Sequence, residues 1–170
     1  MYYLKILYFF SFLGFVMESN VYKLSNSNRH SGIFKGPITT VYGFGALALV
    51  LLDKYLFSNL NLFKYFNFII AFVVCTIVLT FIEWLGGNIL NKTLKIDMWD
   101  YSNKPYHYGK YICLDLALTW GLMGSIYLNL LKNFFDGFIN LIPNGLIWIV
   151  LVLNIIDVLF IIRKKIIKVT

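Results

Sequence analysis

The sequence predicts an all-α integral membrane protein: a bundle of about five transmembrane helices forming a single domain over residues 1–170. Hydrophobic residues make up 59% of the chain and charged residues only 14%, whereas a soluble domain carries roughly 25% charged residues. Five apolar stretches approach the ~20 residues that a helix needs to cross the hydrocarbon core of a bilayer. Most of the surface should therefore face lipid or other apolar side chains.

The first two predicted helices are joined by a polar loop that ends in Gly36-Pro37. The first, residues 2–22, resembles a signal peptide, but no small-x-small cleavage site precedes Glu18, so we expect it to be retained. The second, residues 38–57, begins directly after Pro37.

The third predicted helix, residues 65–90, is the longest apolar run, and a second polar loop separates it from the fourth, residues 111–131. The aromatic-rich stretch 133–142 is typical of an interfacial segment, with a segment that dips into the membrane as the alternative, and the turn residues Pro143-Asn144-Gly145 close it. The fifth predicted helix, residues 146–162, is short.

Lysine and arginine residues are distributed unequally between the two sides of this bundle. By the positive-inside rule the richer side is cytoplasmic, which places the N-terminus outside, the C-terminus inside and both long polar loops in the cytoplasm. The net charge of +7 therefore indicates helix orientation, and we expect no nucleic-acid partner. The poorer set is Lys5, Lys54, Lys64 and Lys132; the richer set is Lys23, Arg29, Lys35, Lys92, Lys95, Lys104, Lys110, Arg163, Lys164, Lys165 and Lys168.

Acidic residues inside the apolar stretches are the main candidates for a substrate or ion site. Glu18, Glu83 and Asp115 approach the cytoplasmic ends of the first, third and fourth helices, on faces that also carry small and hydroxyl residues. A carboxylate at such a depth must be protonated, pair with a base or bind a cation. The alternative is structural: these acids could bond loop backbone or pair with nearby lysine and arginine side chains.

The two polar loops contain turn-forming residues and should fold compactly. Asp100 is placed to accept backbone N–H groups in a tight turn. No nucleophile–base spacing identifies a chemistry, so no catalytic residue is assigned, and Glu83 with Asp100 is the alternative acid–base pair. The loop-motif candidates are Arg29, Gly36, Pro37, Tyr42, Gly43, Trp99, Asp100, Tyr101, Ser102 and Pro105.

Histidine and cysteine spacing gives no sign of a metal site. His30 and His107 stand alone in separate loops, and Cys75 and Cys113 have no histidine at ligand spacing. We therefore expect no metal and no cofactor.

The chain contains a weak internal repeat. Glu18, a polar loop ending in Gly36-Pro37, and Tyr42-Gly43 are echoed by Glu83, a polar loop with Lys104-Pro105, and Trp120-Gly121. The first and third helices are expected to run in the same direction, so the pattern predicts a parallel two-helix repeat.

These motifs together resemble a bacterial family of small polytopic membrane proteins known as putative ABC-transporter type IV. The residues that carry the resemblance are 12–15 with Glu18, 32–37 with 41–45, Glu83, and 99–102 with Pro105, Gly109 and 112–113. Thr40 and Tyr106-His107-Tyr108 depart from the family pattern, where proline and asparagine are common.

The resemblance implies a multi-pass protein of the bacterial cell membrane that acts as a permease-like transport subunit. The sequence has no Gly-x-x-x-x-Gly-Lys-Ser/Thr phosphate loop, so an ATPase would be a separate cytoplasmic partner. Two alternatives stay open: a membrane-embedded enzyme acting on a lipid or isoprenoid headgroup, and a non-catalytic scaffold or small ion-coupled carrier. The lipid bilayer is the other expected partner, and a homo-oligomer is also left open.

Overall fold

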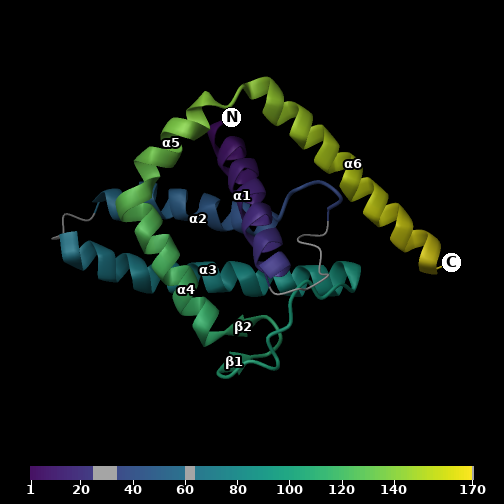
Figure 1. The fold of residues 1–170 in the computed structure, drawn as a ribbon, viewed down its shortest axis with the longest axis horizontal. Helices are drawn as coiled ribbons and strands as arrows, with labels where there is room; N and C mark the ends of the chain where they lie inside the picture. The colour runs from purple at the N-terminus through teal and green to yellow at the C-terminus, as the bar shows by residue number, and fades with distance from the viewer. Residues whose placement is uncertain (25–33, 60–63, 170) are drawn as a thin grey trace. The chain divides into compact units, whose positions relative to one another are not determined.

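The protein is almost entirely helical. The computed structural model describes the backbone of residues 1–24, 34–59 and 64–169, and the side chains of residues 1–24, 34–58 and 67–163. Figure 1 shows the elements in chain order. They are α1 (Tyr2–Leu24), α2 (Thr40–Tyr55), a 3₁₀ turn η1 (Phe57–Asn59), α3 (Lys64–Leu94), β1 (His107–Tyr108), β2 (Ile112–Cys113), α4 (Leu114–Ile126), a π-helical turn η2 (Tyr127–Leu131), α5 (Lys132–Leu141) and α6 (Asn144–Val169).

Four helical stretches in the described part of the chain are long and apolar enough to cross a membrane. They are Tyr2–Leu24, Asn67–Leu94, Leu114–Leu141 and Asn144–Arg163. Their surfaces carry many exposed leucine, isoleucine, valine and phenylalanine side chains, which is the pattern of helices that face lipid. The predicted all-α membrane bundle is confirmed. The helix α2 has 16 residues and is shorter than each of these four stretches.

The fourth predicted helix differs most from its sequence-based boundaries. It begins at Leu114, after the two-stranded hairpin, and helical backbone continues through η2 and α5 to Leu141. The stretch 133–142, expected as a separate interfacial segment, is thus largely the last part of a longer helical run. Pro143 ends that run because its ring cannot continue a helix.

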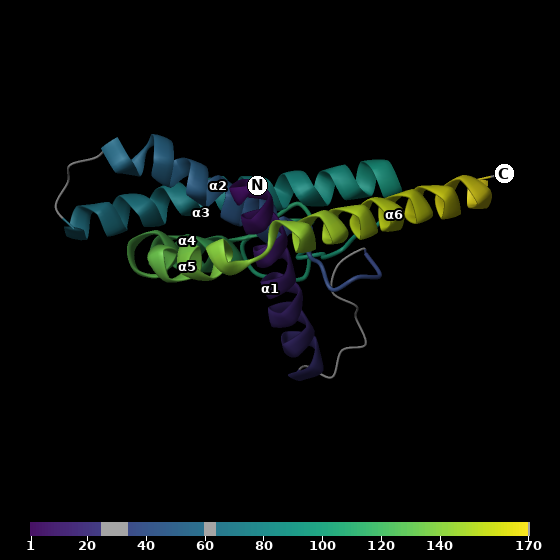
Figure 2. The ribbon, with the colours of Figure 1, turned by 90° about the horizontal axis from the view of Figure 1, so that it is seen from above.

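Contacts divide the chain into two compact units. The first comprises Met1–Phe44 and Phe138–Thr170, and the second comprises Gly45–Gly137. In the first unit, α1 meets the beginning of α2, and the N-terminal ends of α1 and α6 lie side by side in both ribbon views (Figure 2). The buried residues Tyr8, Ser11 and Gly14 of α1 are spaced by three and therefore lie on one face of the helix.

The second unit is built on the packing of α3 against α4. Small residues allow the two backbones to approach closely. A Cβ on Gly121 would lie 2.9 Å from the Phe72 carbonyl oxygen, and one on Gly124 would lie 2.8 Å from the Cys75 Cβ. Close packing of this kind replaces the hydrophobic driving force that helices lack in lipid.

Candidate functional site

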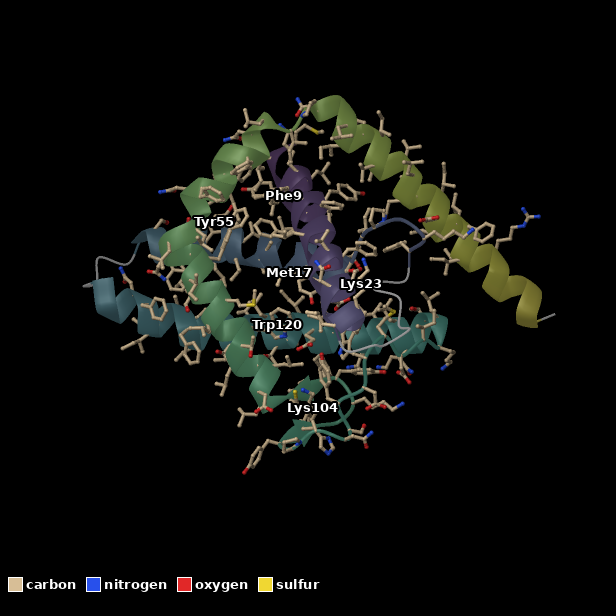
Figure 3. All side chains as sticks on the ribbon, in the orientation of Figure 1. Phe9, Met17, Lys23, Tyr55, Lys104 and Trp120 are labelled. Carbon is tan, nitrogen blue, oxygen red and sulfur yellow. The ribbon has the colours of Figure 1, made fainter. Side chains whose placement is uncertain are left out.

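Glu83 is the buried carboxylate of the second unit, with 6% of its surface exposed. The Tyr101 hydroxyl donates to Glu83 Oε1 at 2.8 Å, and the Trp120 indole N–H donates to Oε2 at 3.0 Å. Figure 3 shows Trp120 where α4 crosses α3. A carboxylate is costly to bury unless its oxygens are hydrogen-bonded, and this arrangement provides a donor to each oxygen. Glu83 thereby joins α3, α4 and the loop between them.

A second carboxylate, Asp97, fastens the loop that follows α3. It accepts hydrogen bonds from the Tyr111 hydroxyl at 2.5 Å, the Asn91 amide at 2.8 Å and the Lys110 ammonium at 3.0 Å. The Tyr111 hydroxyl, and then Lys110, lower the pKa of Asp97. Burial and the bond to Asp97 raise the pKa of Tyr111 to about 12. The Asp97 contacts close the two ends of the loop against each other.

The Tyr111 ring also contacts the end of α3 directly. A Cβ on Gly87 would lie 2.6 Å from the Tyr111 Cγ atom, so only a residue without a side chain fits there. The Trp99 ring meets the Tyr111 ring edge-on, with the ring centroids 6.3 Å apart. These aromatic contacts hold the loop against α3.

Asp100 forms the tight turn that the sequence predicts. Its Oδ1 accepts the Ser102 backbone N–H at 2.9 Å and the Ser102 hydroxyl at 2.5 Å. These two bonds lower the pKa of Asp100. The Asp100 side chain is exposed, and the neighbouring Tyr101 points the other way, to Glu83.

The loop presents a short hairpin with two exposed tyrosines. His107–Tyr108 pairs antiparallel with Ile112–Cys113, and Tyr106 and Tyr108 are 79% and 75% exposed. Tyr106 adopts φ +53°, a left-handed conformation that is uncommon for a tyrosine. We name residues 95–113 the polar cap.

The first unit holds Glu18 in a simpler setting. The Tyr42 hydroxyl of α2 donates to Glu18 Oε1 at 3.1 Å, and a Cβ on Gly14 would overlap the Tyr42 ring. Nearby, the Gly36 backbone N–H donates to Asp157 Oδ2 at 3.2 Å. The segment before α2 is thus bonded to α6, as the polar cap is bonded to α3.

The structure places the predicted site residues in different surroundings. Glu83 and Tyr101 are hydrogen-bonded to each other, and Tyr111 of the same loop contacts α3. Asp115, in contrast, is exposed in the first turn of α4, and no hydrogen bond described in the structure joins it to Glu83. Pro37 and Pro105 are exposed. Arg29 lies outside the described residues. The described part of the chain contains no cluster of three or more histidine, cysteine, aspartate or glutamate side chains that could hold a metal ion.

Sequence reasoning missed three of the groups that build the site. Trp120 is part of the predicted repeat only, although its bond to Glu83 joins α4 to α3. Asp97 and Tyr111 are not among the predicted site residues, although the bond between them holds the polar cap together. The feature of the sequence that could have identified Trp120 as a site residue is its position beside Gly121. Pairing Asp97 with Lys110 requires knowledge of how the loop folds.

Comparisons with known proteins add a family assignment. The family model described as "Putative ABC-transporter type IV" matches residues 6–162, from α1 into α6. No curated protein and no solved structure matches the chain. The match covers far more than half of the chain, and the four apolar helices fit a membrane protein. The chain therefore belongs to the ABC-transporter type IV family and is a membrane protein related to transport.

Proposed function

We propose that the chain is the permease-like membrane subunit of a bacterial transporter and that a separate ATPase docks on its polar cap. The family assignment supports a transport role, and the sequence contains no phosphate-loop motif of its own. The positive-inside distribution of lysine and arginine supports a cytoplasmic position for the cap, on the side where ATP is available.

The geometry of the polar cap is the observation that carries the docking proposal. Bonds from Tyr101 to Glu83 and from Asn91 to Asp97 fasten the cap to α3, while Tyr106 and Tyr108 stand exposed on its hairpin. Exposed tyrosines on a rigid support are typical of the central residues of protein interfaces. A cap coupled to a buried carboxylate would connect a docked ATPase with the helix pair α3–α4.

Co-purification from native membranes tests this function. The tagged full chain, extracted in mild detergent, should retain a protein that carries a phosphate loop and hydrolyses ATP. Replacing both Tyr106 and Tyr108 by alanine should lower its recovery at least about tenfold, as expected for loss of two interface aromatics.

Tyr55→Ala is the matched control, because Tyr55 is also an exposed tyrosine, 66% exposed, at the end of α2. It lies on the side expected to face outward and should leave recovery unchanged. A chain that purifies alone, or an ATPase whose recovery is the same from both variants, would overturn the proposal.

A further inference from the structure

The crossing of α3 and α4 combines three features. Thr76 and Glu83 stand two helical turns apart on the same face of α3. Gly121 of α4 lies against Thr76: a Cβ there would be 1.9 Å from the Thr76 hydroxyl oxygen and 2.9 Å from the Phe72 carbonyl oxygen. The residue before this glycine, Trp120, donates to the Glu83 carboxylate.

The crossing of α1 and α2, in the other unit, has the same three features. Ser11 and Glu18 stand at the same two-turn spacing on α1. A Cβ on Gly43 of α2 would lie 2.2 Å from the Ser11 hydroxyl oxygen and 2.3 Å from the Leu7 carbonyl oxygen. The residue before this glycine, Tyr42, donates to Glu18.

The agreement extends to the hydroxyl groups. Ser11 Oγ donates to the Leu7 carbonyl at 2.6 Å, and Thr76 Oγ1 donates to the Phe72 carbonyl at 2.7 Å. In both units the carbonyl that accepts this bond is the one that the partner's glycine approaches. A glycine at a helix crossing is common in membranes, but a glycine, a back-bonded hydroxyl, a carboxylate two turns on and an aromatic donor beside the glycine form a far more specific combination.

We infer that the chain carries one carboxylate clamp twice, and that Glu18 and Glu83 are equivalent groups held by the equivalent positioning residues Tyr42 and Trp120. We define the carboxylate clamp as hydroxyl, glutamate, aromatic donor and glycine: Ser11, Glu18, Tyr42 and Gly43 in the first copy, and Thr76, Glu83, Trp120 and Gly121 in the second. The two copies use different donors, the Tyr42 O–H in the first and the Trp120 N–H in the second. In both copies a glutamate carboxylate accepts the hydrogen bond.

Two equivalent carboxylates add detail to the proposed transport function. Their role in transport rests on that proposal. Each half of the chain then contributes one glutamate at the same place in its helix pair, Glu83 buried and Glu18 partly buried, and the two should respond alike when their clamp is altered. Asp115 has no place in this scheme.

Chemical labelling of the full chain in native membranes tests the equivalence. Dicyclohexylcarbodiimide enters the bilayer and modifies protonated carboxyl groups, and mass spectrometry of the peptides assigns the label to Glu18 or Glu83. A hydrogen-bond donor stabilises the ionised carboxylate. Tyr42→Phe should therefore increase labelling of Glu18 alone, and Trp120→Phe should increase labelling of Glu83 alone, each about tenfold.

Glu18→Gln and Glu83→Gln provide the blanks that assign each labelled peptide. An increase at Glu83 in the Trp120 variant without an increase at Glu18 in the Tyr42 variant would overturn the equivalence. If a phenylalanine variant fails to accumulate, Tyr42→Trp and Trp120→Tyr decide the question, since each retains a donor. Recovery of the protein supports the clamp, and continued loss contradicts it. The labelling needs no ATPase, so it can succeed even if the docking proposal fails.

Discussion

Glu83 and its donors illustrate how single residues carry the structure of the second unit. The carboxylate lies in an apolar helix pair, where each missing hydrogen bond leaves a buried polar atom without a partner. Tyr101 supplies its bond from the polar cap and Trp120 from α4. The same carboxylate therefore supports both a loop and a helix crossing.

Removing the Tyr101 hydroxyl should weaken this support. We expect Tyr101→Phe to lower the free energy of unfolding by about 1–3 kcal/mol, because Glu83 Oε1 loses the Tyr101 hydrogen bond while remaining buried. Thermal unfolding of the protein in detergent measures the change. Tyr108→Phe is the control: its side chain is 75% exposed, and its loss should change stability by less than about 0.5 kcal/mol. Equal shifts in both variants would contradict the role of the Tyr101 bond.

The Asp97 contacts predict how the polar cap responds to acid. The pKa of Asp97 is lowered in the folded protein by Tyr111 and Lys110. Its contribution to stability is therefore present above the ordinary carboxyl pKa, about 3.9, and is lost as the pH falls through the lowered pKa.

Hydrogen exchange of the cap amides, corrected for intrinsic rates, should show protection that is steady near neutral pH and falls below about pH 4. In Asp97→Asn this acid-dependent loss should become smaller, because the remaining part comes from Asp100, whose pKa is also lowered. An unchanged acid profile in that variant would assign the transition to another carboxyl group.

The sequence predicts these residues unevenly. Glu83 and Trp99–Ser102 stand out because a carboxylate in an apolar run and a dense polar loop are costly without a reason. The partners of Glu83 could not be predicted, because Tyr101 lies in the loop after α3 and Trp120 in α4. Their contact with Glu83 depends on how the loop folds and how α4 packs on α3. Asp53 is a similar case: Lys54 is its neighbour in the sequence, but the structure pairs it with Lys132, far along the chain.

At the scale of helices, two glycines allow the effect of helix packing on stability to be measured apart from the effect of intrinsic helix propensity. Gly121 lies in contact with Thr76 and Phe72, whereas nothing lies within 4 Å of a Cβ placed on Gly137 of α5. We expect Gly121→Ala to destabilise the protein by about 1–3 kcal/mol, because the added methyl group must push α3 and α4 apart.

Gly137→Ala should be neutral or stabilising by up to about 1 kcal/mol, because alanine favours helix more than glycine does. Both values come from thermal or denaturant unfolding in the same detergent. If Gly121→Ala were as stable as Gly137→Ala, the close approach of α3 and α4 would not be a feature of the folded protein.

Helix existence was easier to predict than helix ends. Long apolar runs identified the helices because a bilayer core requires them. The start of α4 was placed too early because Tyr111, Ile112 and Cys113 are apolar, yet they belong to the hairpin and to the contact with Gly87. The end was placed too early because polar residues such as Asn133 and Asp136 in α5 interrupt the apolar pattern without ending the helix.

For the whole molecule, the charge distribution makes a prediction about topology. If the polar cap is cytoplasmic, a membrane-impermeant maleimide should label Asn103→Cys in inside-out vesicles and leave it unlabelled in intact cells. Ser58→Cys, beyond the end of α2, should show the opposite pattern. The native Cys75 and Cys113 are buried, so unsubstituted protein gives the background. Labelling of both sites from the same side would contradict the prediction that the two ends of α3 lie on opposite sides of the membrane.

Family membership and fold class can be predicted directly from the sequence. Predicting the transport function in detail requires knowledge of the partners. Composition and apolar runs predict the membrane bundle, and the motifs from Phe12 to Cys113 predict the family. Nothing in a single chain specifies what it binds in the membrane or in the cytoplasm. The exposed Tyr106 and Tyr108 are the best starting point, because an exposed aromatic pair on a fixed hairpin suits a partner protein.

The π-helical turn at Tyr127–Leu131 determines how the protein responds to the deletion of one residue there. A π turn contains one residue more than the α-helical turn it replaces, so residues after it are rotated relative to those before it. Deleting Leu130, which is 63% exposed, would convert η2 into regular α-helix and rotate α5 by about a quarter turn. Asp53, paired with Lys132, would then lose its partner. A one-residue deletion here should thus be harmful, because the π turn sets the rotation of α5 that brings Lys132 to Asp53.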